Sequence, residues 1–478
     1  MTGTSRSGTH HLTIVSLAIG ALGLALAGPA SAQGSDDLKA RLDAALKTIE
    51  DLQSRVKALE AQRPGATPAA APVPAAHATA AAAAAPTAPA VAAAEPPPAP
   101  VVAPGAAPDP GVPITETARV EVYGQAMVDA IYDFKRMSPD WQATMRPSQI
   151  PVTCPGSPGC GKDGTFVFSA RQSSLGMRSF VPTPYGTLKT DLSFDLFDAD
   201  GGMGVHWMRA WGEIGQVGFG QTESNFMDLD AFPSIIDYWG PSGMVFLRTP
   251  QLKFTSRADR KLAWAVSFEA PSSAIDTGKI TAIDPSFGAG IQAHNRLPDL
   301  VGSVRSDQDW GHVRAALILR QVGYQNVDSA SGEPSGERTG YGLNVSGAVN
   351  VSSKDKLSWQ LAGGQAIASY MNDGGTDLAP GDDLRAKAVK SFGWFVYYNH
   401  AWSDLWSSSL GASEHRQDTT GGQLGSAFKS GRYASANLLF TLSKNLMLGS
   451  EFVWGRHETR DGSSATDHRL QFSTKASF

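Results

Sequence analysis

The segment from His468 to Phe478 alternates strictly between two kinds of side chain. One face carries Leu470, Phe472, Thr474, Ala476 and Phe478, and the other carries Arg469, Gln471, Ser473, Lys475 and Ser477. A β-strand with lipid on one face and water on the other needs this alternation. A half-buried strand of a soluble sheet has the same pattern, so this segment alone leaves both interpretations open.

The same alternation recurs from residue 118 onward. It predicts sixteen strands, at residues 119–134, 165–180, 185–197, 205–212, 216–222, 244–255, 261–269, 297–306, 312–324, 341–351, 357–370, 389–402, 405–415, 431–442, 446–457 and 468–478. Boundaries taken from one sequence are imprecise, which can change the count by about two. The pattern predicts an all-β fold, a transmembrane antiparallel β-barrel of about sixteen strands.

The connections between these strands are of two kinds. Short polar turns are expected at residues 182–184, 257–260, 352–355 and 443–445, and long loops at 135–164, 223–243, 271–296, 371–387 and 416–430. Short turns at one rim and long loops at the other are the outer-membrane pattern, with the turns in the periplasm. The terminal aromatic Phe478 is typical of bacterial outer-membrane barrels, where we expect it to serve barrel assembly.

The N-terminus predicts export. Arg6 lies in a short polar region, residues 12–27 are apolar and uncharged, and Ala30, Ser31 and Ala32 form a small-residue cleavage site. We therefore expect residues 1–32 to be a signal peptide. No later stretch approaches the roughly 20 apolar residues of a membrane-spanning helix, so a membrane location requires the barrel. The predicted location is the bacterial outer membrane.

Residues 33–63 predict a helix that is separate from the barrel. Apolar residues recur at heptad spacing, at Leu38, Leu42, Ala45, Ile49, Leu52, Val56 and Leu59. We interpret this seam as a periplasmic coiled coil. The heptad rules do not decide whether the coiled coil contains two or three helices. A helix lying on a membrane is disfavoured, because the polar face mixes acidic and basic residues. Residues 64–117 are mostly Ala and Pro and predict a disordered or polyproline-like linker to the barrel at 118–478.

Composition agrees with a barrel. Of the 478 residues, 42% are hydrophobic, 18% are charged and 50 are glycine, which is too polar for a bundle of spanning helices. The formal net charge of -5 does not identify a cargo.

The two cysteines, Cys154 and Cys160, are close together in an exported chain, so we expect a disulfide that stiffens a surface loop. A metal site would need more ligands nearby.

A barrel of this width is too large to be filled by the side chains of its wall, so the sequence predicts an aqueous channel. The loop at residues 223–243 is partly apolar and is expected to fold into the lumen, with Phe226, Met227, Asp228 and Asp230 in the constriction. Cations on the wall would favour anionic solutes. The candidate pore-lining residues are Arg171, Lys189, Lys253, Arg314, Arg320, Arg469 and Lys475, diluted by Asp191, Asp195, Glu269 and Glu451. For each of them, a salt bridge within the wall is the alternative.

Several short motifs, in their order and spacing, resemble the DcaP-like porins. They are SARQS at 169–173, FGQT at 219–222, FMD at 226–228, GPSG at 240–243, RTPQL at 248–252 and GSEFVWGR at 449–456. The resemblance implies a homotrimer of barrels with an N-terminal coiled coil and passive uptake of small anionic solutes such as dicarboxylates. It favours Arg171 as a lumen residue. By strand parity Arg248 falls on the lipid-facing row, which implies a position above the bilayer or a register shift at a bulge.

Parts of the sequence are also compatible with two other classes of function. In the first, the periplasmic helix binds peptidoglycan and the barrel is mainly an anchor, so that the protein is a structural tether. In the second, the barrel holds an enzyme, but His400, His415, His457 and His468 have no serine in a recognisable nucleophile motif to accompany them. The sequence contains no nucleotide-binding motif or metal-ligand cluster. We therefore expect no catalysis, no cofactor and no nucleic acid, with membrane lipid, further copies of the chain and small anions as partners.

Overall fold

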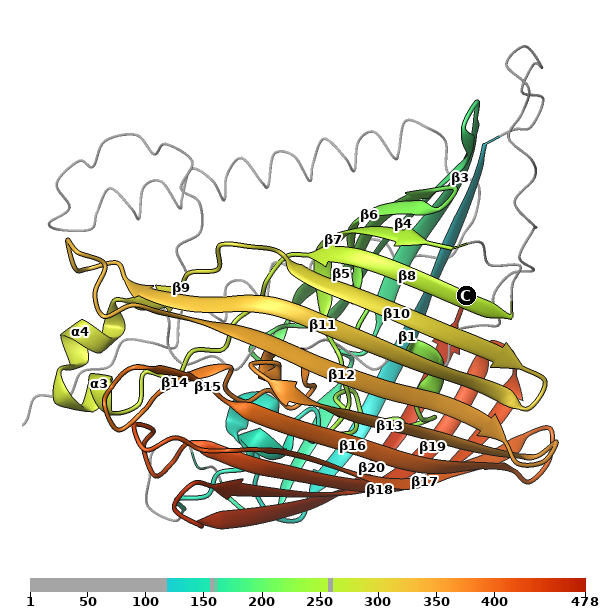
Figure 1. Cartoon of the computed structure of the whole chain (residues 1–478). Helices are drawn as coiled ribbons and strands as arrows, with labels where there is room; N and C mark the ends of the chain where they lie inside the picture. Colours follow the sequence, from blue (N-terminus) through green and yellow to red (C-terminus); the bar gives the residue numbers. More distant parts are fainter. Residues whose placement is uncertain (1–117, 155–159, 161, 257–260) are drawn as a thin grey trace, which may run out of the picture. The chain divides into compact units, whose positions relative to one another are not determined.

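The computed structural model describes residues 118–154, 160, 162–256 and 261–478. The predicted signal peptide, coiled-coil helix and linker lie outside these residues, as does the predicted turn at 257–260. The described part consists mainly of strands and the loops that join them (Figure 1). No helix within it is long and apolar enough to cross a membrane.

The strands follow one another around an antiparallel sheet. Their bounds are β1 Arg119–Asp133, β2 Thr165–Ser169, β3 Ser174–Thr183, β4 Gly186–Phe197, β5 Met203–Ile214, β6 Val217–Glu223, β7 Arg248–Thr255, β8 Leu262–Glu269, β9 Ile291–Ala293, β10 Asp299–Gln308, β11 Gly311–Asn326, β12 Gly336–Asn350, β13 Asp355–Gln365, β16 Lys390–Ala401, β17 Trp406–Gln417, β18 Phe428–Ser443, β19 Leu446–Thr459 and β20 Ser464–Ser477. A small hairpin, β14 Leu378–Pro380 and β15 Ala386–Ala388, and two short helices, α3 Lys279–Ile283 and α4 Pro285–Ala289, lie in the loops.

The sheet closes on itself. Strands β2 and β3 pair in turn with β1, and β9 and β10 pair in turn with β11, so each of these couples makes one strand of the wall. β20 pairs with β1, with Ser473 opposite Asp129, and this pairing closes the barrel. The described residues thus form sixteen wall strands. The predicted transmembrane antiparallel barrel is confirmed.

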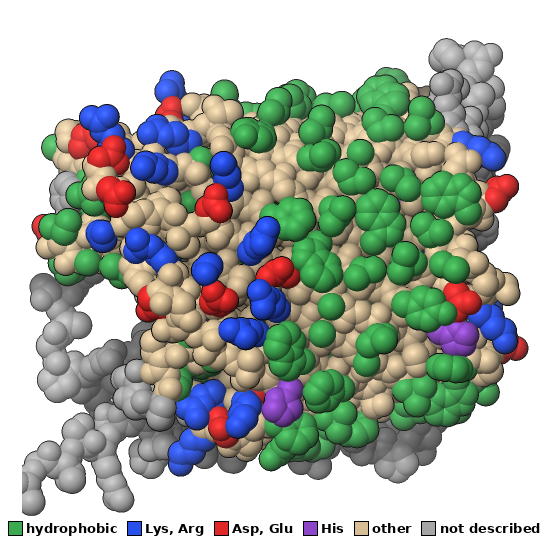
Figure 2. Space-filling view, turned by 60° about the horizontal axis from the view of Figure 1, so that its bottom comes forward, with side chains coloured by type: hydrophobic (Ala, Val, Ile, Leu, Met, Phe, Trp, Pro, Cys, Tyr) green, Lys and Arg blue, Asp and Glu red, His purple; other side chains and the backbone are tan. Residues whose placement is uncertain are grey.

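The two faces of the wall differ as the sequence pattern predicts. On β11, Leu317 and Leu319 are 61% and 56% exposed, whereas Ala316 and Ile318 are 1% exposed. Lipid accepts apolar side chains outside, and the inward face is covered by the interior of the barrel. Hydrophobic side chains accordingly form a broad band on the outer surface (Figure 2).

Two wall strands are shorter than predicted, because apolar residues next to them turn into the lumen. β7 begins at Arg248 instead of residue 244, and β13 ends at Gln365 instead of residue 370. Residues 244–247 and 366–370 are buried inside the barrel, so they show the apolar composition of a strand without belonging to the wall.

The main hydrophobic cluster lies inside the barrel. Loop residues in it include Trp141, Met145, Tyr238, Trp239, Phe246, Tyr370 and Met371, and they pack against inward-facing wall residues such as Phe395, Tyr397, Tyr433 and Val453. Arg146 stacks between the rings of Trp141 and Trp239, at 4.5 and 4.3 Å from their centroids. Described residues of three loops therefore supply a packed core within the lumen. These loops lie at residues 134–164, called the first loop below, 224–247 and 366–389.

Candidate channel interior

The loop at residues 224–247, called the third loop below, is held at two points by buried carboxylates of the wall. At its start, Glu269 accepts hydrogen bonds from Ser224 Oγ at 2.6 Å and from the Asn225 amide at 2.8 Å. Farther along, Glu451 accepts hydrogen bonds from the amides of Ile236 at 2.9 Å and Asp237 at 3.0 Å. These contacts satisfy backbone donors that would otherwise be buried without partners.

Asp237 joins the third loop to the first loop and to the wall. Its carboxylate accepts hydrogen bonds from Thr144 Oγ1 at 3.0 Å, the Met145 amide at 2.9 Å and the Tyr433 hydroxyl at 3.2 Å. Burial raises the pKa of Asp237 above its ordinary value, although the nearby Arg469 guanidinium and these hydrogen bonds oppose the change. The carboxylate is thus a structural acceptor, enclosed by protein.

The four residues predicted for the constriction occupy different environments. Phe226, Met227 and Asp228 are 0%, 2% and 1% exposed, while the side chain of Asp230 is 64% exposed. Asp228 is hydrogen-bonded to His312 at 2.9 Å. Burial would raise the pKa of Asp228, but the hydrogen bond with His312 and the charges around it hold that pKa below its ordinary value. Of the four, only Asp230 presents most of its side chain to water, and it pairs with Arg305.

Two of the seven candidate pore-lining cations are buried ion-pair partners. Arg320 lies 3.2 Å from Asp299 and 3.6 Å from Asp377, and Arg469 lies 2.8 Å from Asp133. The side chains of both arginines are 0% exposed. Residues of the loops that fold into the barrel cover both arginines. This burial differs from the sequence-based expectation that the two side chains line the channel.

Replacing Arg320 with alanine should destabilise the folded barrel by about 3–5 kcal/mol, because it leaves the carboxylates of Asp299 and Asp377 buried without their cation. Urea unfolding followed by tryptophan fluorescence measures the change. The matched control is Arg338→Ala on the neighbouring strand, where the side chain is exposed and the expected change is below about 0.5 kcal/mol. Equal unfolding midpoints for the two variants would show that the buried ion pairs do not stabilise the barrel.

The other five cations differ in their pairing. Lys189 forms an ion pair with Glu213 at 2.9 Å. Among the described residues, no carboxylate forms an ion pair with the remaining four, which are Arg171, Lys253, Arg314 and Lys475. Each of the five lies on the inward face or, for Arg171, in the bend between β2 and β3.

Lys253 and Arg314 come together where the third loop leaves the wall. Arg314 Nη2 donates hydrogen bonds to the Asn225 carbonyl at 2.9 Å and to Ser303 Oγ at 3.1 Å, and its Nε is buried without a hydrogen-bond partner. The Lys253 ammonium lies 5.1 Å from the centre of the Trp211 ring and is close enough to Arg314 for the two charges to repel each other. This corner of the interior therefore holds two cations that no carboxylate neutralises through an ion pair.

The four carboxylates predicted to dilute the lumen cations all have partners. Asp191 accepts hydrogen bonds from Tyr123 and Arg178, and Asp195 accepts one from the Tyr238 hydroxyl at 2.8 Å. Glu269 and Glu451 hold the third loop. Glu269 is in addition close enough to Lys253 and Arg314 for its charge to attract both cations, although it forms no ion pair with either.

Arg209, which was not predicted as an interior residue, and Arg248 both bind Glu223, each at 2.8 Å. Strand parity places Arg248 on the lipid-facing row, but its side chain is 3% exposed and is paired within the barrel. The parity rule fails here because β7 begins at this residue and the chain has only just left the lumen. Arg305 of β10 forms ion pairs with Asp228 and Asp230. It follows Val304, which faces outward, and lies on the same inward row as Ser303. Strand parity would therefore have identified Arg305 as an interior residue.

The remaining predicted site residues lie away from this corner. Cys154 and Cys160 form a disulfide in the first loop. Phe478 is 62% exposed, and its backbone pairs with Gly124 of β1 at 3.0 and 3.1 Å. Its ring therefore belongs to the outer surface, next to the seam that closes the barrel.

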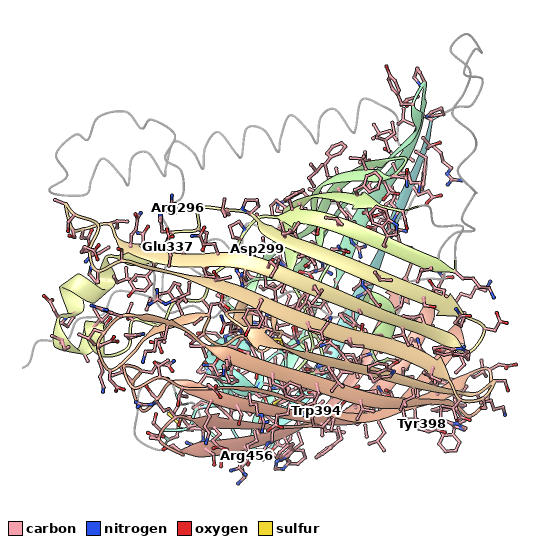
Figure 3. The ribbon with its side chains drawn as sticks, viewed as in Figure 1. Arg296, Asp299, Glu337, Trp394, Tyr398 and Arg456 are labelled. Carbon is pink, nitrogen blue, oxygen red and sulfur yellow. A yellow bond between two sulfur atoms is a disulfide. The ribbon has the colours of Figure 1, made fainter. Side chains whose placement is uncertain are left out.

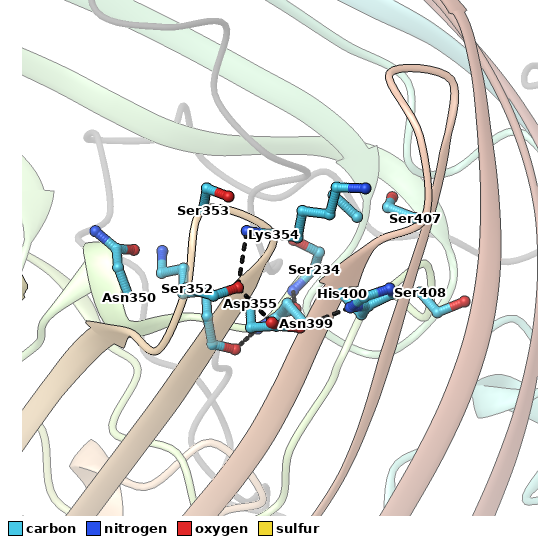
Figure 4. Close-up of a pocket in the computed structure, with 12 residues that line it drawn as sticks. Ser234, Asn350, Ser352, Ser353, Lys354, Asp355, Asn399, His400, Ser407 and Ser408 are labelled. Carbon is cyan, nitrogen blue, oxygen red and sulfur yellow. Dashed lines mark hydrogen bonds and ion pairs between the residues drawn. The ribbon is translucent and has the colours of Figure 1, made fainter.

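A polar pocket lies at the rim of the short turns (Figure 4). It is lined by the β12–β13 turn, by Asn399 and His400 of β16, and by Ser234 of the third loop. His400 Nδ1 lies 2.6 Å from Asp355, which fixes the turn. Ser234 shows that the third loop extends to this rim. The described residues contain no group of three or more His, Cys, Asp or Glu side chains suited to a metal ion.

Comparisons with known proteins agree with the fold. A family model described as DcaP outer membrane protein matches residues 108–279. The solved outer membrane channel DcaP of Acinetobacter baumannii is 22% identical, with a TM-score of 0.63 over 76% of this chain and 97% of that chain. An anion-selective porin from Comamonas acidovorans is 12% identical, with a TM-score of 0.50 over 76% of this chain and 100% of that chain. No protein of curated function matches.

These structural likenesses have low sequence identity and establish the fold, while the family model rests on the sequence itself. The barrel therefore has the fold of the outer-membrane porins, and the resemblance to the DcaP outer membrane proteins is confirmed, with residues 108–279 matching the family model.

Proposed function

We propose that this chain is a passive channel for small anionic solutes, with a lumen narrowed by the third loop. The observation that carries the proposal is the pair of inward-facing cations, Lys253 and Arg314, at the point where the third loop leaves the wall. Carboxylates such as Glu269 and Asp228 act on these cations but form no ion pair with either of them among the described residues, so we infer that part of their positive field reaches the lumen. Such a field attracts anions and repels cations in a narrow pore.

The proposed solutes are dicarboxylates, because Lys253 and Arg314 offer two separate cations to one molecule. Arg171 and Lys475 are proposed as further lumen cations, because neither forms an ion pair with a carboxylate among the described residues. The name of the Comamonas acidovorans protein, an anion-selective porin, describes the same kind of selectivity on a similar fold. By analogy with trimeric porins, we propose that the working form is a homotrimer of barrels.

Planar-bilayer recording of the purified protein tests this function. Under a salt gradient, the reversal potential should show preference for the anion, and channels should open in groups of three steps. Addition of a small dicarboxylate such as succinate should interrupt the current transiently, whereas acetate at the same concentration should do so less. A silent barrel, or one that prefers cations, contradicts the proposal.

A further inference from the structure

The outer surface of the barrel carries a cluster of cations that takes no part in the channel. Figure 2 shows Lys and Arg side chains, with Asp and Glu side chains among them, gathered over one end of the displayed face, while hydrophobic side chains cover most of the rest. The cluster belongs to strands β16 to β19, near the rim of the long loops. We define the cationic patch as Lys390, Arg416, Lys429, Arg432 and Arg456.

Strand register places the patch on the lipid-facing side of the wall. Arg432 of β18 lies directly opposite Glu414 on one neighbouring strand and Arg456 on the other. Two residues farther from the long-loop rim, the same outward row continues with Ala434 and Trp454. Figure 3 shows Arg456 on the outer edge of the wall, with Tyr398 nearer the short-turn rim. The patch therefore borders the apolar band directly.

The positive charges of the patch exceed its negative charges. Glu414 accepts a hydrogen bond from Arg432 at 2.9 Å, and Glu458 accepts one from Lys429 at 2.7 Å. Among the described residues, none forms an ion pair with Lys390, Arg416 or Arg456. Asp418 is exposed, follows Arg416 on the outward row, and its amide donates a hydrogen bond to the carbonyl of Lys390 at 2.9 Å. Five cations thus meet three carboxylates.

The positions within the patch are electrostatically unfavourable on their own. Like charges directly opposite each other, as in Arg432 and Arg456, destabilise a sheet. A bound anion at the outer surface would relieve this repulsion.

We propose that the cationic patch binds the phosphates of an anionic lipid in the outer leaflet. A phosphate matches the forked donors of arginine, and the acyl chains of the same lipid cover the apolar band that begins below Arg432 and Arg456. The short-turn half of the same face supports this assignment. Within the described parts of β16 to β19, no Lys or Arg faces outward there, and Tyr398 and Trp406 are exposed instead. The charge therefore lies on the side of one leaflet.

The test uses the complete folded protein in detergent, titrated with lipid and followed by native mass spectrometry. The probes are a bis-phosphorylated glycolipid, its dephosphorylated form and inorganic phosphate. The unmodified protein should bind the phosphorylated lipid about tenfold more tightly than the dephosphorylated one. The double variant Arg432→Glu with Arg456→Glu should lose this preference. The control, Lys444→Glu in the exposed turn at the opposite rim, should keep it.

A second double variant, Arg432→Gln with Arg456→Gln, removes the two positive charges without adding acidic residues. It replaces the double glutamate variant in the test if that variant folds poorly. Equal binding of the two lipids by the unmodified protein would overturn the proposal, as would an unchanged preference in the glutamine variant. Inorganic phosphate that binds as tightly as the lipid would assign the patch to the free ion. Loss of the oligomer with unchanged lipid binding would assign it to contacts between copies of the chain.

Discussion

Replacing both Lys253 and Arg314 with glutamate should convert the channel from anion preference to cation preference. These cations have no carboxylate ion-pair partner among the described residues and meet at the start of the third loop. An ion that passes about 6 Å from a unit charge, at an effective dielectric constant of about 40, gains or loses about 1.4 kcal/mol, which is a tenfold effect. Reversal of two charges should therefore change the anion-to-cation permeability ratio by at least about tenfold. The reversal potential under a salt gradient measures this ratio.

Two controls separate the position of the charge from its mere presence. The exchange Lys253→Arg with Arg314→Lys keeps both charges and should keep anion preference. Lys189→Glu also reverses a charge on the inward face, but Lys189 forms an ion pair with Glu213 and its side chain is 52% exposed. This variant should change the anion-to-cation permeability ratio less. If the variant with two glutamates keeps the original ratio, Lys253 and Arg314 do not set the selectivity. If Lys189→Glu has an equal effect, selectivity comes from total charge and the corner has no special role.

The wall of the barrel could be predicted from the sequence, because lipid imposes a rule on every strand. A residue that faces the hydrocarbon layer must be apolar or small, whatever the rest of the protein does, so a period of two survives along the membrane-spanning part of each strand. Leu317 and Leu319 illustrate this rule, and parity correctly separates them from Ala316 and Ile318. The same rule fails where the chain is apolar for another reason. Residues 244–247 resemble strand and are instead buried inside the barrel.

The interior could be predicted only in part, because parity gives the direction of a side chain and not what covers it. Arg320 and Arg314 lie on the same inward row of β11, yet Arg320 is enclosed by Asp299 and Asp377, and Arg314 retains a buried Nε without a hydrogen-bond partner. Asp377 lies in a loop 57 residues later in the chain, and nothing in the local pattern connects the two. Glu451 is a similar case, since its partners belong to the third loop, far away in sequence.

Replacing Glu451 with alanine should free one end of the third loop and enlarge the pore. The carboxylate accepts hydrogen bonds from the amides of Ile236 and Asp237 and from Asn437 Nδ2 at 2.8 Å, so its removal leaves at least two backbone donors buried without partners. Each such donor costs about 1–3 kcal/mol, which predicts a loss of stability of about 2–6 kcal/mol in the loop or in the whole barrel. A loop with this anchor weakened should populate positions farther from its packed place against the wall.

The readout for Glu451→Ala is single-channel conductance, which should rise and become noisier, together with faster protease cleavage within the third loop. Glu451→Gln retains an oxygen that accepts a hydrogen bond and should lie between the alanine variant and the unmodified protein. Glu458→Ala provides the matched control, because Glu458 lies on the same strand, faces outward and pairs with Lys429, so its removal should leave the conductance unchanged. Unchanged conductance in Glu451→Ala, with the barrel still folded, would mean that the remaining contacts of Ser224, Asn225 and Asp237 are sufficient to hold the loop.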